Sequence, residues 1–197
     1  MEFTLPVPSL RERAARLMQN SVPGKSSPAA LSSRPPPVEL RGLDMRIGRD
    51  GTWYYRDSPI NRLPLVKLFA SVLRRDSDGS FWLVTPAERG RVVVEDAPFI
   101  AVAVDKQGAG RDRALIFRTN LDEIVTAGPG HPLRIDTAED GTPAPYIMVR
   151  PGLEARLSRP VFYELVDFGE EETIAGEQQF GVWSRGVFFR LGDPEAE

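Results

Sequence analysis

The sequence contains no cysteine and only one histidine, His131, in 197 residues. The missing cysteines exclude disulfide bonds, thiolate metal sites and a cysteine nucleophile, and a reducing, cytoplasmic environment suits such a chain. A lone histidine lacks the second histidine or cysteine that a zinc site needs. We therefore expect no metal and no cofactor. His131 stands in a Gly-Pro turn, which indicates a turn or surface role, with a catalytic base as the alternative.

Long hydrophobic runs are also missing. No apolar stretch approaches the roughly 18 residues that a bilayer crossing needs, and the N-terminus has no continuous apolar core of a secretory signal. Hydrophobic residues make up 41% of the chain and charged residues 27%, as is typical of soluble proteins. We expect a soluble protein without a membrane partner.

The charge is nearly balanced overall but unevenly distributed. The net charge is −3; residues 1–37 carry five basic and two acidic residues, residues 38–163 eighteen and seventeen, and residues 164–197 two and nine. Nucleic-acid binding would require a basic face on the body of the protein. The distribution argues against a nucleic-acid partner.

The first 37 residues are expected to stand apart from the body. The Ser9–Glu12 sequence, Ser-Leu-Arg-Glu, matches a capping box and predicts a short helix to about Asn20. The stretch from Ser21 to Pro37 is rich in Pro, Ser and Gly, which favours a mobile linker. We expect the helix to dock on its own protein or to fray in solution, with binding to a membrane or as a partner peptide as the alternatives.

The body shows turn signals between short apolar runs, beginning with Asp50-Gly51, which predicts a β-hairpin with Trp53 and Tyr55 on one face. Many short strands with one clear helix predict an α+β fold with mostly antiparallel sheet. Further strands are expected at 81–85, 91–94, 99–104, 114–119, 133–135, 146–150, 161–166 and 179–191.

The helix is expected at Arg62–Arg74, with Asn61 as its N-cap and Pro64 in its first turn, where a missing N–H costs nothing. Its apolar residues gather on one side, and most of its basic residues lie on the other. The basic residues are therefore expected to form the solvated face of a core helix. The alternative is that Arg62 and Lys67 point into a ligand cleft.

An internal repeat is indicated by two stretches that begin at Leu73 and Leu133. Both start Leu-Arg-x-Asp, pass an Asp-Gly turn and run through an apolar strand to a proline. We expect a duplicated unit, with chance similarity of two hairpins as the alternative. The expected divisions are 1–37 for the helix and linker, 38–107 for a first α+β unit and 108–197 for a second, β-rich unit.

Four longer stretches, "DGTWYYRDSPINRLPLVKLFASVLRRDSDGSFWLVTP", "VEDAPFIAVAV", "TAGPGHPLRI" and "FGVWSRGVFFRL", resemble the bacterial family known as domain of unknown function 1285. The resemblance covers roughly Asp44 to Leu191. It implies a duplicated α+β core and a C-terminal half loosely similar to pleckstrin-homology-like barrels, without an established activity. It also implies a small-ligand or signalling role at a cleft between the two halves.

Catalytic constellations are not evident in the sequence. Glu88, Glu95 and Asp96 lie around an expected strand and are interpreted as solvated loop ends, with general acids or bases as the alternative. The lone Gly108-Ala109-Gly110 precedes a strand rather than a helix, so it is interpreted as a turn and not as a nucleotide site. The sequence shows no recognisable combination of a nucleophile, metal ligands or an acid–base pair, which favours a protein that is not an enzyme.

Candidate binding residues lie at expected strand ends and on the expected helix. Adjacent hydroxyl and amide groups can donate and accept hydrogen bonds, and an arginine fork can hold a carboxylate or phosphate. For Arg150 the alternative is a salt bridge to Glu154 or another acid. The candidates are Trp53, Arg62, Lys67, Thr119, Asn120, Arg150 and Tyr163.

The leading functional hypothesis is a cytoplasmic, non-enzymatic protein that binds a small anionic or nucleotide-like molecule between its two halves and acts in regulation or signalling. One alternative is a protein–protein interaction module that uses exposed strand edges or the N-terminal helix. A second alternative is an enzyme of unknown reaction.

Overall fold

A computed structural model describes residues 37–40, 42–138 and 140–192. The expected N-terminal helix and nearly all of the expected linker lie outside the described residues. The chain divides into two compact units: the N-terminal unit includes Tyr54–Val93 and the residues up to Arg46, and the C-terminal unit includes Ile47–Trp53 and the residues from Val94 onward. The C-terminal unit thus begins earlier than residue 108, because β8 (Phe99–Gln107) pairs only with strands of that unit.

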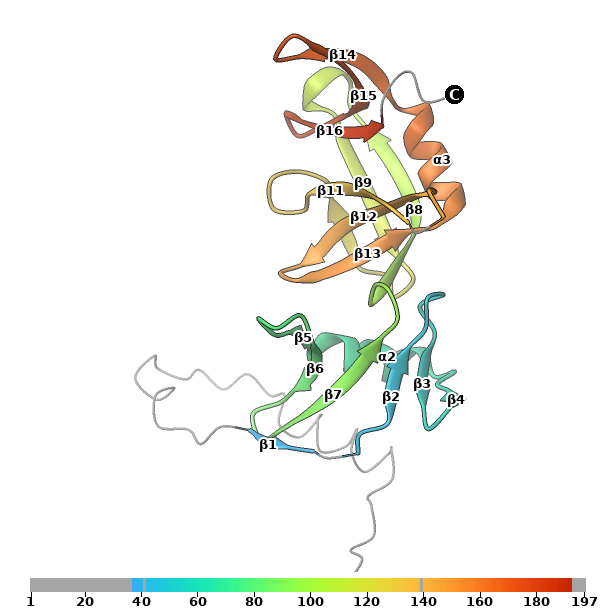
Figure 1. Cartoon of the computed structure of the whole chain (residues 1–197), viewed down its shortest axis with the longest axis vertical. Coiled ribbons are helices and arrows are strands. Elements are labelled where there is room, and N and C mark those ends of the chain that lie inside the picture. The colour runs from blue at the N-terminus through green and yellow to red at the C-terminus, as the bar shows by residue number, and fades with distance from the viewer. Residues whose placement is uncertain (1–36, 41, 139, 193–197) are drawn as a thin grey trace, which may run out of the picture. The chain divides into compact units, whose positions relative to one another are not determined.

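Most of a seven-stranded sheet lies in the N-terminal unit, with the order β4-β3-β2-β7-β6-β5 and with β1 beside β7 (Figure 1). The last residue of β2, the first residue of β3 and the turn between them belong to the C-terminal unit. Asp50-Gly51 lies between β2 and β3 as expected, and Gly51 has a φ of 78°, a conformation that glycine adopts readily. The strands are β1 (Val38–Glu39), β2 (Met45–Ile47), β3 (Trp53–Tyr55), β4 (Ser58–Pro59), β5 (Leu73–Arg75), β6 (Phe81–Val84) and β7 (Glu88–Val94).

The helix of this unit, α2 (Leu63–Ser71), confirms the expected helix but is shorter at both ends. Pro64 occupies its first turn, and Val66, Phe69 and Ala70 form its buried face at helical spacing. The helix ends at Ser71 because the next residues form β5, which pairs with β6. Arg74 therefore lies on a strand and not on the solvated face of a helix.

The C-terminal unit contains a six-stranded sheet with the order β10-β9-β8-β13-β12-β11. Its strands are β8 (Phe99–Gln107), β9 (Ala114–Thr119), β10 (Ile124–Thr126), β11 (Leu133–Thr137), β12 (Pro143–Arg150) and β13 (Leu153–Leu157), and a 3-10 turn, η2 (Gly110–Asp112), precedes β9. Taken in chain order, these six strands have the same neighbours as β2 to β7 have in the first sheet. The stretches from Leu73 and Leu133 form the corresponding antiparallel strands β5-β6-β7 and β11-β12-β13.

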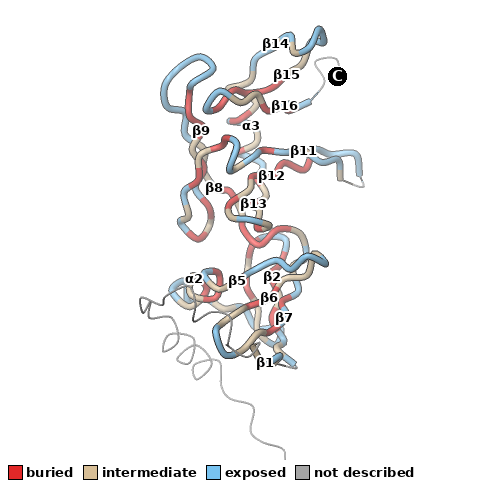
Figure 2. The backbone as a smooth tube through the Cα atoms, turned by 90° about the vertical axis from the view of Figure 1, so that its left-hand side faces the viewer, coloured by how far each residue is buried: buried red, intermediate tan, exposed pale blue. Residues whose placement is uncertain are grey.

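The expected strand at 161–166 is wrong. These residues belong to a second helix, α3 (Arg159–Asp167), in which Val161 and Leu165 are buried at a spacing of four residues. Figure 2 shows how burial varies along the backbone. Pro160 in the first turn and contacts of α3 with β8 and with β15 override the β preference of the valine and aromatic residues. The expectation of one main helix is corrected accordingly.

A three-stranded sheet completes the C-terminal unit. It consists of β14 (Glu170–Ile174), β15 (Glu177–Ser184) and β16 (Val187–Gly192), in that order. The single strand expected at 179–191 is thus two strands, joined by a turn at Arg185-Gly186 where both residues have positive φ. The architecture is mostly β with two helices in the described ranges, which confirms the α+β class.

Hydrogen bonds of buried polar groups connect the three-stranded sheet to the rest of the unit. Arg113, which is 8% exposed, donates from Nε to the Trp183 carbonyl at 3.0 Å and from its terminal nitrogen to Glu170 at 2.8 Å. The Ser184 hydroxyl, fully buried, accepts from the Leu115 N–H and donates to the Ala127 carbonyl. These bonds satisfy groups that burial would otherwise leave unpaired.

Candidate functional site

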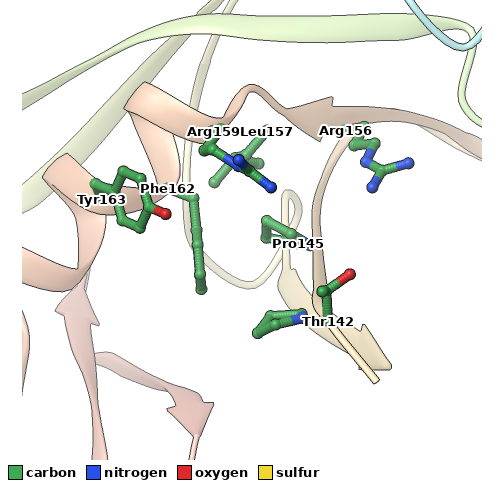
Figure 3. A pocket seen from close by; sticks show the side chains of 8 residues that line it. Thr142, Pro145, Arg156, Leu157, Arg159, Phe162 and Tyr163 are labelled. Atoms are coloured by element: carbon green, nitrogen blue, oxygen red, sulfur yellow. The ribbon is translucent and has the colours of Figure 1, made fainter. Parts of the chain in front are cut away.

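A pocket of about 300 Å³ opens where β13 ends and α3 begins (Figure 3). Its two walls come from the first residues of β12 and from the first turns of α3. The pocket combines two arginines with two aromatic rings and two prolines. It is lined by Thr142, Pro143, Pro145, Arg156, Leu157, Arg159, Phe162 and Tyr163.

The local fold explains why these side chains meet. β13 carries Arg156 and ends at Leu157, and α3 starts two residues later. Arg159, Phe162 and Tyr163 are spaced by three and four residues, so they lie on one side of α3, while Val161 and Leu165 are buried. Tyr163 remains 60% exposed. The pocket therefore has an aromatic wall that is open to solvent.

Arg156 is held by a carboxylate on its other side. Its guanidinium donates to Asp96, 60 residues away in the sequence, and this bond raises the pKa of Arg156. Asp96 also accepts from the Tyr146 hydroxyl at 2.7 Å. Burial and the Asp96 bond raise the pKa of Tyr146 to about 12. Arg156 is thus a fixed cation, whereas Arg159 is exposed and has no ion pair within the described ranges.

A second, more polar pocket of about 410 Å³ shares Arg156 with the first. Its acidic groups are engaged: Asp136 is bound by Arg134, and Asp140 accepts from Thr142, which lowers the pKa of Asp140. The described residues hold no cluster of three or more histidine or acidic groups that could bind a metal. The pocket is lined by Arg49, Glu95, Asp96, Asp136, Thr137, Ala138, Asp140, Ala144, Tyr146 and Arg156.

Two of the candidate residues from the sequence lie in the N-terminal unit. Lys67 is on α2, and Arg62 is the residue that precedes the helix. Arg62 is exposed and Lys67 is half-buried. Neither lines a pocket described above.

The other candidates lie in the C-terminal unit and mostly serve its structure. The Thr119 hydroxyl is fully buried and accepts from the N–H groups of Leu121 and Glu123. The Asn120 side chain accepts from the Ile100 N–H at 3.0 Å. Both therefore support the turn that follows β9.

Arg150 and Trp53 also have structural surroundings. Arg150 pairs with Glu123 at 3.1 Å and lies 5.3 Å from the centre of the Phe99 ring. The ion pair with Glu123 agrees with the alternative expected for Arg150, a salt bridge to Glu154 or another acid. Trp53 is 1% exposed. Among the seven candidates, Tyr163 alone lines one of the pockets described here.

Sequence reasoning missed Arg156, Arg159 and Phe162. A signal was present: Ser158-Arg159-Pro160 resembles a helix start, and a helix from Arg159 would have placed Arg159, Phe162 and Tyr163 together. No comparable signal exists for Arg156, because its partner Asp96 is distant in the sequence. His131 lies in a turn as expected, with its ring Nδ1 2.9 Å from the Met148 carbonyl oxygen.

The fold and pocket define a class of protein with two mixed α+β units of the same strand order and a cationic, aromatic pocket in the second unit. Two family models match the chain: the DUF1285 N-terminal domain over residues 34–97 and the DUF1285 C-terminal domain over residues 98–191. The chain belongs to the DUF1285 family, whose models describe domains of unknown function.

Solved structures agree with this assignment. A DUF1285 family protein from Silicibacter pomeroyi DSS-3 is 41% identical, with a TM-score of 0.80, and the match covers 96% of this chain and 98% of that one. A DUF1285 family protein from Shewanella baltica OS155 is 26% identical, with a TM-score of 0.51, over 64% of this chain and 92% of that one. No curated protein matches the chain. Neither helix in the described ranges is long and apolar enough to cross a membrane.

Proposed function

We propose that this protein binds a small organic anion in the pocket at the β13–α3 junction and serves a regulatory function without chemically changing its ligand. The observation that carries the proposal is the pairing of two arginines with two aromatic rings around one hollow. Guanidinium groups form strong charge-assisted hydrogen bonds with carboxylates and phosphates. Phe162 and Tyr163 offer faces for a flat apolar body.

The pocket volume of about 300 Å³ is at the lower end of the range for small-molecule sites. That volume favours a compact ligand, such as an aromatic carboxylate or the phosphate-bearing part of a nucleotide. The two arginines have different roles: Arg156 is positioned by Asp96, while Arg159 is available to close over a bound anion. We place the ligand in the C-terminal unit because all the lining residues belong to it.

The neighbouring acidic groups support binding rather than acid–base chemistry. Asp96 is occupied by Arg156 and Tyr146, and Glu95 accepts from the Arg49 N–H at 3.2 Å. A general base must be free to take a proton from its substrate. These carboxylates instead hold their neighbours in place.

A thermal-shift screen of aromatic carboxylates and nucleotides tests the proposal. A ligand that binds only the folded protein must raise the melting temperature as its concentration increases. The best compound should bind Arg159→Ala about tenfold or more weakly, since a charge-assisted hydrogen bond contributes about 1.5 to 3 kcal/mol. Arg118→Ala, which removes an exposed arginine on β9, is the matched control and should bind normally. A screen without any stabilising anion would contradict the proposal.

A further inference from the structure

An arginine-flanked tryptophan lies on the sheet of the N-terminal unit. In the register of the sheet, Arg74 on β5 lies opposite Trp82 on β6, and Trp82 lies opposite Arg91 on β7. Arg89, two residues before Arg91, places its guanidinium 4.1 Å from the centre of the Trp82 ring. Arg89 is therefore stacked on Trp82, and Arg74 and Arg91 flank Trp82 on the two neighbouring strands. We call Arg74, Trp82, Arg89 and Arg91 the arginine face.

Strand alternation puts these residues on one side of the sheet. The neighbouring residues Leu73, Leu83 and Gly90 are also paired across the three strands, and all three are buried. The side chains of Leu73 and Leu83 must point to the opposite side of the sheet. Arg74 and Arg91 are exposed, and Arg89 is partly exposed. The sheet therefore presents a charged row on one side and packs its apolar row on the other.

Two of the three arginines of the arginine face have no ion pair within the described ranges. Arg91 has no ion pair within the described ranges, and Arg74 donates only to the backbone carbonyls of Ser71 and Leu73. Arg89 lies 3.6 Å from Glu39 and 3.7 Å from Asp76, at the long limit for an ion pair. Asp78 also interacts electrostatically with Arg91, so three carboxylates lie around the face, but within the described ranges none of them forms an ion pair with Arg74 or Arg91.

The spacing of these cations matches an extended chain. Arg89 and Arg91 are alternate residues of one strand, so their Cα atoms lie about 6.6 to 6.8 Å apart, which is also the spacing of alternate side chains in an extended peptide. Arg74 is two strands away from Arg91, about 9.5 Å across the sheet. A segment with acidic residues at alternate positions could therefore engage Arg89 and Arg91 along β7 and reach Arg74 across β6.

Single-stranded nucleic acid fits the face less well. Its binding sites combine cations with aromatic rings on which bases stack. Trp82 is only 9% exposed, and Arg89 already covers its ring. The face therefore offers charge without an open stacking surface, which favours carboxylates.

We propose that the arginine face docks an extended acidic segment of a partner protein. This surface is independent of the anion pocket, since all its residues belong to the N-terminal unit. Arg89, Arg91 and Arg74 bind the carboxylates, and the buried Trp82 supports Arg89 from below. The partner is defined by its chemistry: glutamate or aspartate at alternate positions in a strand-like segment.

A binding titration with a labelled peptide tests this proposal. The probe is a short peptide with glutamate at every second position, compared with the same peptide carrying lysine and with a short oligothymidylate. The alternating glutamate peptide should bind, weaken with added salt and change the fluorescence of Trp82. Arg91→Ala and Arg89→Ala should each weaken it by up to about fivefold, and together by about tenfold. In Trp82→Phe, the change in tryptophan fluorescence on binding of the peptide should disappear.

Arg118→Ala is the matched control, because it removes an exposed arginine from the C-terminal unit. Normal binding by this variant, with loss in the arginine-face variants, supports the proposal. Failure of the glutamate peptide to bind, or equal losses in all arginine variants, overturns it. Tighter binding of the oligothymidylate with the same dependence on Arg89 and Arg91 would replace the acidic partner with a nucleic acid.

Discussion

The two sheets share a strand order but differ in where a helix is inserted. In the N-terminal unit α2 lies between β4 and β5, after the first three strands of the pattern. In the C-terminal unit the corresponding step, from β10 to β11, is a short turn held by a bridge between Gly128 and His131, and the helix α3 follows the last strand instead. The proposed binding pocket lies at the start of α3. The unit that carries the pocket is therefore the one in which the helix follows the last strand of the sheet.

The comparison also separates structural from functional arginines. Arg113 is buried and bonded to the three-stranded sheet, whereas Arg159 is exposed at the pocket. Removing the first should destabilise the protein, while removing the second should alter binding alone.

The largest expected effect concerns α2. Phe69 is 2% exposed, and Phe69→Ala should lower the free energy of unfolding by about 3 to 5 kcal/mol because it leaves a cavity. Leu63→Ala on the same helix, where the side chain is 44% exposed, should lower it by less than about 1 kcal/mol. Denaturant unfolding checks both variants, and the opposite order would show that the faces of α2 are wrongly assigned.

Leu165→Ala tests whether α3 is a core element of the second unit as α2 is of the first. Leu165 is fully buried, so the loss should be about 2 to 5 kcal/mol. Denaturant unfolding gives the value. A loss below about 1 kcal/mol would mean that α3 is only loosely attached, and the pocket wall would lose its rigid support.

Arg113→Met should cost about 1.5 to 3 kcal/mol, because hydrogen bonds to a charged group are lost and the Trp183 carbonyl is left unpaired. Arg111→Ala is the matched control: it is 65% exposed in its ion pair with Glu172 and should cost less than about 1 kcal/mol. Equal stabilities of the two variants, measured by thermal unfolding, would contradict the role of Arg113 in holding the three-stranded sheet against the rest of the unit.

Alkaline pH should lower the stability of the protein by deprotonating Tyr146, which donates a hydrogen bond to Asp96. The pKa of Tyr146 rises from 10.0 to about 12 in the folded protein, so folding favours the protonated phenol. Its contribution is fully present below pH 10 and is lost as the pH rises to about 12. Stability measured over this range should fall more steeply for the natural protein than for Tyr146→Phe. Parallel curves would show that burial and the Asp96 bond do not raise the pKa of Tyr146 in the folded protein.

The smallest effect on stability is expected for Arg159→Ala. The side chain is exposed and has no ion pair within the described ranges, so the free energy of unfolding should change by less than about 0.5 kcal/mol. Thermal unfolding without ligand checks this. A large loss would indicate that Arg159 supports the fold and would weaken its assignment to binding.

Local patterns in the sequence predicted much of the fold. Pro64 and the spacing of apolar residues located α2, Asp50-Gly51 located the first hairpin turn, and the paired stretches from Leu73 and Leu133 located equivalent strands. The sequence misled at α3, because valine and aromatic residues favour strands unless tertiary packing selects a helix. That error also concealed the pocket.

The candidate site depended on contacts that local patterns do not encode. Thr119 and Asn120 have side chains that suit a ligand, but the structure uses them in the turn after β9. Arg156 becomes a positioned cation only through Asp96, on a distant part of the chain. Tyr163 was predicted without its neighbours, since Arg159 and Phe162 join it only on a helix.

A crystal structure of the protein with the best compound from the anion screen tests the central claim most directly. We expect the anionic group within hydrogen-bonding distance of Arg159 and its flat body against Phe162 or Tyr163, with Arg156 still bound to Asp96. A ligand found elsewhere, for example beside Arg49 in the polar pocket or outside the C-terminal unit, would contradict the assignment of anion binding to the β13–α3 junction.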